Sequence, residues 1–151
     1  MFINVLYIDD EPHNLNSFKA SFRRDFHVFI AESAEEGKEI LERENIHVIL
    51  SDQRMPKMTG IEFFESILET YPDPMRILIT GYTDINAVID AINRGKVYHY
   101  LTKPWNDSDI KISIEKAFEV YRLRKENIEL TDKLIDVNKK LEFLARQNLL
   151  S

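Results

Sequence analysis

The chain contains no cysteine, and this absence excludes disulfide bonds, thiolate metal sites and a cysteine nucleophile. It also lacks a cluster of basic residues: 26 acidic residues against 20 basic ones give a net charge of −6, so we expect no direct binding of nucleic acid by this segment. No apolar run approaches membrane-spanning length, and the N-terminus shows no basic, apolar and small-residue export signal. These absences predict a cytoplasmic protein with no membrane contact.

Short apolar runs instead alternate with amphipathic stretches along the chain. The apolar runs lie near residues 3–8, 26–31, 46–51, 75–80 and 97–101. The helix-like stretches lie near residues 12–24, 34–44, 60–70, 84–94 and from 107 onward. Five such units predict an α/β fold, a doubly wound parallel five-stranded sheet with helices on both faces, over about 120 residues.

Helix starts carry candidate N-caps. Ser33 with Glu36 three residues later matches a capping box, and Asp84 and Asp107 precede the fourth and fifth helices. These residues predict where three of the helices begin.

The last helix continues past the predicted sheet, without Pro or Gly from Trp105 onward. With Val120 at heptad position a, the a positions hold Val120, Asn127, Leu134, Leu141 and Asn148, and the d positions hold Leu123, Leu130, Val137 and Leu144. This pattern predicts a coiled coil over residues 120–151, and Asn127 at position a favours a parallel homodimer. Ile128 and Ile135 widen the apolar face, so a helix folding back onto its own domain is the alternative.

Polar residues follow four of the apolar runs directly. Asp9 and Asp10 follow the first run, Asp52 the third, Thr80 the fourth and Lys103 the fifth. Because the carboxyl ends of parallel strands share one edge of a sheet, these groups should converge. Three carboxylates suit a hard divalent cation, Mg²⁺ with Mn²⁺ as a second possibility, while a hydroxyl and an ammonium suit a phosphoryl group.

Four segments around these groups resemble the receiver domain of bacterial two-component response regulators. They are Leu6-Tyr7-Ile8-Asp9-Asp10-Glu11-Pro12, Ser51-Asp52-Gln53-Arg54-Met55-Pro56-Lys57-Met58-Thr59-Gly60, Ile79-Thr80-Gly81 and Tyr100-Leu101-Thr102-Lys103-Pro104. The resemblance covers residues 2–122, implies a flavodoxin-like (βα)5 fold, and places a receiver domain at 1–122 ahead of the coiled-coil helix.

The resemblance also implies roles for the site residues. Asp52 would be the phosphoacceptor, Asp10 a direct magnesium ligand, Asp9 a ligand acting directly or through water, and the backbone carbonyl of Arg54 a further ligand. Thr80 and Lys103 would contact the phosphoryl group, and Tyr100 would turn inward with Thr80. Gly81, Tyr82 and Pro104 would border the site, and a cis Lys103–Pro104 bond would turn the lysine toward it.

The implied function is phosphorelay signalling. Asp52 would accept a phosphoryl group from a histidine kinase or phosphotransfer protein, and the switch would pass to the dimeric C-terminal helix and to an effector, beyond Ser151 or separate. The chain would catalyse only its own phosphorylation and dephosphorylation. The loop Lys96–His99 is one residue longer than is usual, so Tyr98 could share the role of Tyr100, and Arg54 and Tyr82 are positioned to hinder hydrolysis.

Other classes explain less of the sequence. A haloacid-dehalogenase-like phosphatase needs a second acid two residues after its nucleophile, where this chain has Arg54. A flavodoxin-like nucleotide binder needs a phosphate-binding loop after the first strand, where Asp9-Asp10-Glu11 would repel phosphate. A phosphorylation-independent dimerisation or interaction module with a receiver fold stays open as the alternative.

Overall fold

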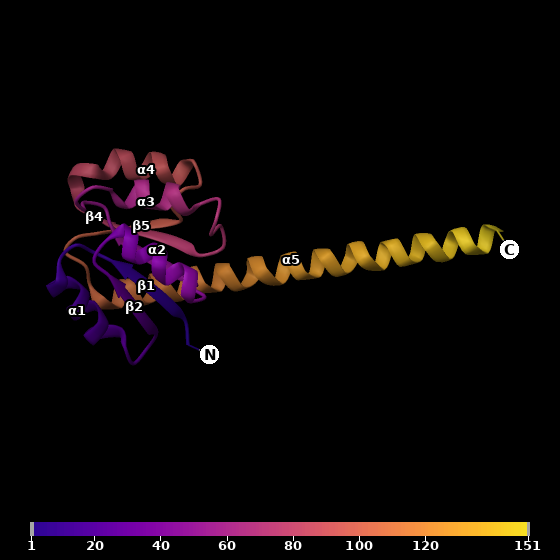
Figure 1. Cartoon of the computed structure of the whole chain (residues 1–151), viewed down its shortest axis with the longest axis horizontal. Coiled ribbons are helices and arrows are strands. Elements are labelled where there is room, and N and C mark those ends of the chain that lie inside the picture. Colours follow the sequence, from indigo (N-terminus) through magenta and orange to yellow (C-terminus); the bar gives the residue numbers. More distant parts are fainter. Residues whose placement is uncertain (1, 151) are drawn as a thin grey trace. The chain divides into compact units, whose positions relative to one another are not determined.

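The computed structural model describes residues 2–150, without the side chains of residues 82, 149 and 150. The strands are β1 (Asn4–Ile8), β2 (His27–Ala31), β3 (Val48–Asp52), β4 (Met75–Thr80) and β5 (His99–Thr102). The helices are α1 (Pro12–Phe22), α2 (Ala34–Arg43), α3 (Gly60–Ile67), the 3-10 turn η1 (Tyr82–Asp84), α4 (Ile85–Asn93) and α5 (Asp107–Leu150). The predicted alternation of five strands with five α-helices is confirmed (Figure 1).

All five strands are parallel, in the order β2-β1-β3-β4-β5. Asp52, the last residue of β3, pairs with Ile79 of β4. Thr80, one residue later, pairs with Thr102 of β5. This register confirms the predicted doubly wound, flavodoxin-like sheet, and it brings the carboxyl ends of β3, β4 and β5 level with one another.

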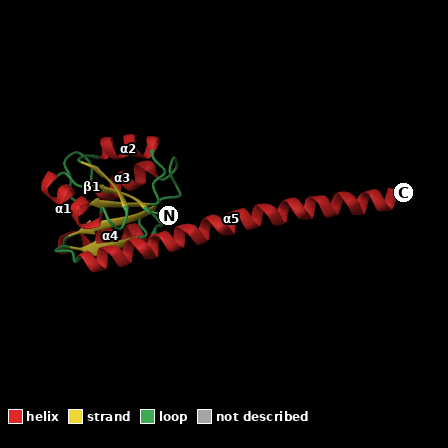
Figure 2. Ribbon diagram, turned by 90° about the horizontal axis from the view of Figure 1, so that it is seen from below, coloured by secondary structure: helices red, strands yellow, loops and turns green. Residues whose placement is uncertain are grey.

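The two faces of the sheet are covered by different helices. Tyr7 and Ile8 are neighbours in β1 and therefore point to opposite faces. The ring of Tyr7 lies 4.4 Å from that of Phe18 in α1. Ile8 lies against Gly37 of α2, where a Cβ atom would come within 2.7 Å of it. Figure 2 shows the strands as a layer with α2 and α3 on one side and the start of α5 on the other.

Helix starts differ from the predicted caps in three places. Ser33 accepts from the amide of Glu36, but the Glu36 carboxylate accepts from Glu32, so the capping box is incomplete. Asp84 bonds Arg54 rather than its own helix. Asn106, not Asp107, accepts from the amide of Ser108 at the start of α5. A capping prediction fails wherever a nearer partner in the fold competes for the side chain.

A complete capping box occurs at α3, where the sequence analysis proposed none. The Thr59 hydroxyl accepts from the amide of Glu62, and the Glu62 carboxylate accepts from the amide of Thr59. Gly60 follows, and a Cβ atom there would lie 2.7 Å from the carbonyl oxygen of Asp52. The glycine therefore allows α3 to begin directly against the end of β3.

The chain divides into two compact units, Met1–Phe118 and Glu119–Ser151. Within the first unit, the start of α5 buries Ile110, Ile114 and Ala117. Within the second unit, the predicted heptad leucines and valine are half exposed, between 49% and 63%: Leu123, Leu130, Leu134, Val137, Leu141 and Leu144. Among residues 2–150, no helix combines the length and the apolar character needed to cross a bilayer.

Candidate functional site

Three carboxylates meet at the carboxyl edge of the sheet. Asp9 and Asp10 follow β1 and Asp52 ends β3, and one ligand oxygen from each lies within 4.8 Å of the others. Asp9 is fully buried, Asp52 is 5% exposed and Asp10 is exposed. Carboxylate oxygens that are so close repel one another unless a cation lies between them. This acceptor-only oxygen set fits a hard divalent cation such as Mg²⁺.

Asp9 is held by three donors. The Tyr7 hydroxyl donates to Oδ2 at 2.5 Å, the Asn14 side-chain amide donates to the same oxygen at 3.1 Å, and the Glu11 backbone amide donates to Oδ1 at 3.0 Å. Burial of Tyr7, together with its bond to Asp9, raises the pKa of the phenol well above its ordinary value, so it stays a donor. No sequence motif singled out Tyr7 or Asn14. The two-residue spacing of Tyr7 in β1 and Asp9 just after it is a usable signal, because alternate residues of an extended segment point to the same side.

Asp52 pairs with the lysine that follows β5. The Lys103 ammonium lies 2.6 Å from Asp52 Oδ1, and the Lys103 backbone amide donates to the carbonyl of Thr80 at 2.9 Å. Burial raises the pKa of Asp52, Lys103 acts in the opposite direction, and Asp9 and Asp10 raise it further. The Lys103–Pro104 peptide bond is cis.

A pocket of about 220 Å³ joins these groups to the end of β4. It is lined by Asp52, Gln53, Arg54, Thr80, Gly81, Thr83 and Lys103. The Thr80 side chain is buried, and its hydroxyl donates to the carbonyl of Gly81 at 3.1 Å. The structure therefore brings together an acid, a hydroxyl and an ammonium around one small pocket, which suits a tetrahedral anion.

Arg54 closes one side of that pocket through contacts with the segment that follows β4. Its Nε donates to Asp84 at 3.1 Å, and its second guanidinium nitrogen donates to the Thr83 hydroxyl at 2.8 Å. The Arg54 side chain is 72% exposed, so the bridge lies at the rim. The sequence analysis placed Arg54 at the site border but missed Asp84 and Thr83; the side chain of Tyr82 lies outside the described residues.

The remaining predicted site residues lie around this edge. Tyr100 in β5 is half-buried and packs against the hydrophobic core, whereas Tyr98 is 37% exposed. Pro104 lines a separate open pocket of about 530 Å³ with Asn14, Lys103 and Trp105. Tyr100 is thus on the strand next to Thr80, but the two aromatic candidates differ in exposure.

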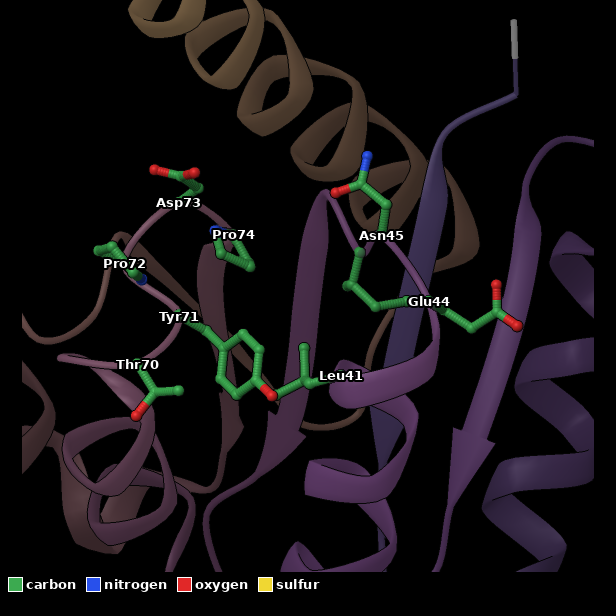
Figure 3. Close-up of a pocket in the computed structure, with 9 residues that line it drawn as sticks. Leu41, Glu44, Asn45, Thr70, Tyr71, Pro72, Asp73 and Pro74 are labelled. Atoms are coloured by element: carbon green, nitrogen blue, oxygen red, sulfur yellow. The ribbon is translucent and has the colours of Figure 1, made fainter.

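A further pocket lies at the opposite edge of the sheet (Figure 3). It measures about 200 Å³ and lies between the end of α2 and the loop before β4, with Leu41, Glu44, Tyr71, Pro72 and Asp73 in its wall. The described residues that line it include two acids, two neutral polar residues and apolar side chains, and none of them is a lysine or an arginine. It therefore lacks the cation that a phosphoryl site requires.

Comparisons with known proteins agree on one family. The family model described as "Response regulator receiver domain" matches residues 5–115. The "Hydrogenase transcriptional regulatory protein HoxA" of Bradyrhizobium diazoefficiens is 36% identical over 122 residues, which are 81% of this chain and 25% of that protein. The chain spans about a quarter of the length of the curated relatives it matches.

Solved structures also match this chain over most of its length. A response regulator receiver domain protein from Clostridium thermocellum matches with a TM-score of 0.76 and 31% identity, over 80% of this chain and 98% of that one. A structure described as "adenylate cyclase from Rhodopirellula baltica" matches with a TM-score of 0.85 and 31% identity, over 88% of this chain and 99% of that one.

Proposed function

Because the chain belongs to the response regulator receiver domain family, we propose that it accepts a phosphoryl group on Asp52 from a histidine kinase or phosphotransfer protein. One observation carries the proposal: the buried Asp52 carboxylate lies at a strand end, 2.6 Å from an ammonium and within 4.8 Å of two further acids. A structural ion pair needs no additional carboxylates beside it, whereas phosphoryl transfer needs a nucleophile, a cation and a positive side chain.

In this role, Asp9, Asp10 and Asp52 would hold Mg²⁺, with the backbone carbonyl of Arg54 as a further ligand; Mn²⁺ has the same preference for oxygen. When bound, the cation would neutralise negative charge on the phosphoryl oxygens. Asp52 attacks phosphorus, its carboxylate oxygen forms the new P–O bond, and the P–N bond to the donor imidazole breaks. The electron pair stays on that nitrogen, which takes a proton from solvent.

Lys103 and Thr80 would then hold the transferred group. The Lys103 ammonium already lies at Asp52 and would shift to a phosphoryl oxygen, a charge-assisted contact worth about 1.5–3 kcal/mol. The Thr80 hydroxyl would leave the Gly81 carbonyl to donate to the same group. We infer that Tyr100, half-buried in β5 and paired with Leu78 two residues before Thr80, turns further inward and alters the surface formed by α4, β5 and α5.

The output would pass through the C-terminal helix. Its half-exposed heptad positions suit a parallel homodimer, with Val120 and Asn127 among the a positions. Curated relatives about four times as long include transcriptional regulators, so an effector beyond Ser151 or on a separate chain would receive the signal. We place the protein in the cytoplasm and assign it no turnover of other substrates.

The deciding experiment is intact mass spectrometry after incubation with phosphoramidate and Mg²⁺. The native chain should gain one phosphoryl group, the gain should disappear when EDTA removes the cation, and Asp52→Asn should gain none. Asp132→Asn, which removes an exposed acid of the second unit, is the matched control and should behave like the native chain. A native chain that stays unmodified would contradict the proposal.

Arg54 offers a second test of the same site. Its bridge to Asp84 and Thr83 lies at the rim of the pocket, where a water molecule must enter to hydrolyse phospho-Asp52. We expect Arg54→Ala to shorten the phosphoryl lifetime severalfold, measured by the decay of the phosphorylated mass. An unchanged lifetime would show that the guanidinium does not restrict water.

A phosphorylation-independent dimerisation module is the second candidate. It is favoured by the half-exposed apolar heptad positions, which lie in the second unit and include none of the site residues. Sedimentation equilibrium of the native chain with and without phosphoramidate and Mg²⁺ separates the two functions. An association constant that is the same in both states supports the module, and a shift supports the phosphorelay receiver.

A further inference from the structure

Asp9 has little capacity left for another partner. A carboxylate has two oxygens with about four lone-pair sites in all. Oδ2 already accepts from the Tyr7 hydroxyl and the Asn14 side-chain amide, and Oδ1 accepts from the Glu11 backbone amide. One site therefore stays open, on Oδ1.

The Tyr7 hydroxyl makes the shortest of these three hydrogen bonds and is held in place by packing. Its 2.5 Å distance to Oδ2 is typical of a hydroxyl donating to a charged carboxylate. The side chain is fully buried, with the Phe18 ring at 4.4 Å and the Trp105 ring at 5.9 Å, edge on. Packing on both sides keeps the hydroxyl aimed at Asp9, so Oδ2 cannot easily turn toward a cation.

From this arrangement we propose that Tyr7 determines which divalent cation the acidic site accepts. The inference rests on the proposed function, since it concerns the same cation site. By occupying Oδ2, Tyr7 limits Asp9 to offering Oδ1 alone, either to the cation or to a water on it. The side chain is a positioning residue: it contacts Asp9 rather than the cation.

The chemistry of the two common cations makes this limit selective. Ca²⁺ takes six to eight oxygens and often uses both oxygens of one carboxylate, whereas Mg²⁺ takes six, prefers single oxygens and retains water. A carboxylate restricted to one oxygen therefore disfavours Ca²⁺ more than Mg²⁺. Asn14 acts in the same direction through the same oxygen, but its hydrogen bond is longer, 3.1 Å against 2.5 Å.

The test compares Mg²⁺ and Ca²⁺ binding by the full chain, with the dissociation constants measured from amide shifts in NMR titrations. Tyr7→Phe removes the hydroxyl and keeps the ring. We expect the ratio of the Ca²⁺ constant to the Mg²⁺ constant to fall about tenfold, the lower end of the effect known for groups that orient metal ligands. Asn14→Ala should lower the ratio less, and it is the safer variant because Asn14 is only half-buried on α1.

Phe22→Leu is the matched control, because it removes a buried ring that packs against Phe18 and leaves Tyr7 with both of its ring neighbours, Phe18 and Trp105. Its ratio should equal that of the native chain. An unchanged ratio in both Tyr7→Phe and Asn14→Ala, even with both affinities weakened, would overturn the inference while leaving the proposed function intact. A native chain that binds neither cation at millimolar concentration would overturn the cation site itself, and with it the proposed function.

Discussion

Replacing Asp52 by asparagine should stabilise the cation-free protein. The substitution keeps the shape of the side chain and removes one negative charge from a group that is 5% exposed. The charge is lost from a cluster in which three carboxylate oxygens lie within 4.8 Å. We therefore expect Asp52→Asn to be more stable than the native chain whenever divalent cations are absent.

The size of the effect follows from the distances. At an effective dielectric constant of about 20, a separation of at most 4.8 Å makes the repulsion between Asp52 and each of the other two acids at least about 3 kcal/mol, and the attraction to Lys103 at 2.6 Å is about 6 kcal/mol before screening by water at the partly exposed lysine. These contributions nearly cancel. The burial of the Asp52 charge then decides the sign, and it costs several kcal/mol even after the structure relaxes. We expect a net gain on the order of 1–3 kcal/mol, because Lys103 is 37% exposed and water can replace its lost partner.

The pH dependence gives an independent check of the sign. Because the pKa of Asp52 is raised above the ordinary 3.8, the folded native chain holds this proton more tightly than the unfolded chain does. The native chain therefore loses stability as pH rises from 3.8 through the folded pKa, and Asp52→Asn lacks this loss. The difference in unfolding free energy between the two proteins should grow as pH rises from 3.8 to above the folded pKa, and should stay constant at higher pH.

Urea unfolding in EDTA, followed by tryptophan fluorescence, measures the difference. Trp105 is the single tryptophan and belongs to the first unit, so the signal reports the unfolding of that unit. Asp132→Asn changes the net charge equally and should leave the midpoint unchanged. Addition of Mg²⁺ should stabilise the native chain, by about 2.7 kcal/mol at a hundred times the dissociation constant, and Asp52→Asn much less.

Equal or lower stability of Asp52→Asn in EDTA at pH 7 would refute the reasoning. It would mean that the Lys103 ion pair outweighs both the burial of the charge and its repulsion by Asp9 and Asp10. The site would then be stable without a cation.

Three further predictions concern other parts of the chain. Lys57 has a φ of 70°, which glycine adopts without a clash. In urea unfolding, Lys57→Gly should therefore raise the free energy of unfolding by about 0.5–1 kcal/mol, and Lys57→Ala should not raise it. Burial lowers the pKa of His47, so the native chain should lose stability as pH falls below 6.5. His47→Asn should reduce this dependence of the unfolding free energy on pH, and the remaining part should come from His99, whose pKa is also lowered. An equal pH dependence in the two proteins would contradict a contribution from His47. If the helix dimerises with Asn127 buried at position a, Asn127→Val should tighten the dimer at least about tenfold by sedimentation equilibrium, and an unchanged constant would exclude that register.

The fold could be predicted because each strand coincides with a short apolar run and each helix with an amphipathic stretch of helical periodicity. Asp9, Asp52 and Thr80 follow or end such runs, and a parallel sheet necessarily brings its carboxyl ends to one edge. Helix caps were less predictable: Asp84 precedes a helix, yet it bonds Arg54, which lies thirty residues earlier. A local pattern cannot show which partner from elsewhere in the fold reaches a side chain first.

The sequence by itself therefore determined the order of the elements, the family and the set of groups that meet at the sheet edge, since these depend on periodicity and on strand ends. Only the tertiary structure decided how those groups are held. That Asn14 of α1 donates to the same oxygen of Asp9 as Tyr7, and that Lys103 lies 2.6 Å from Asp52, depend on distances and side-chain directions between separate elements. Those geometries form only when the strands and helices pack together, because each partner is positioned by a different part of the core.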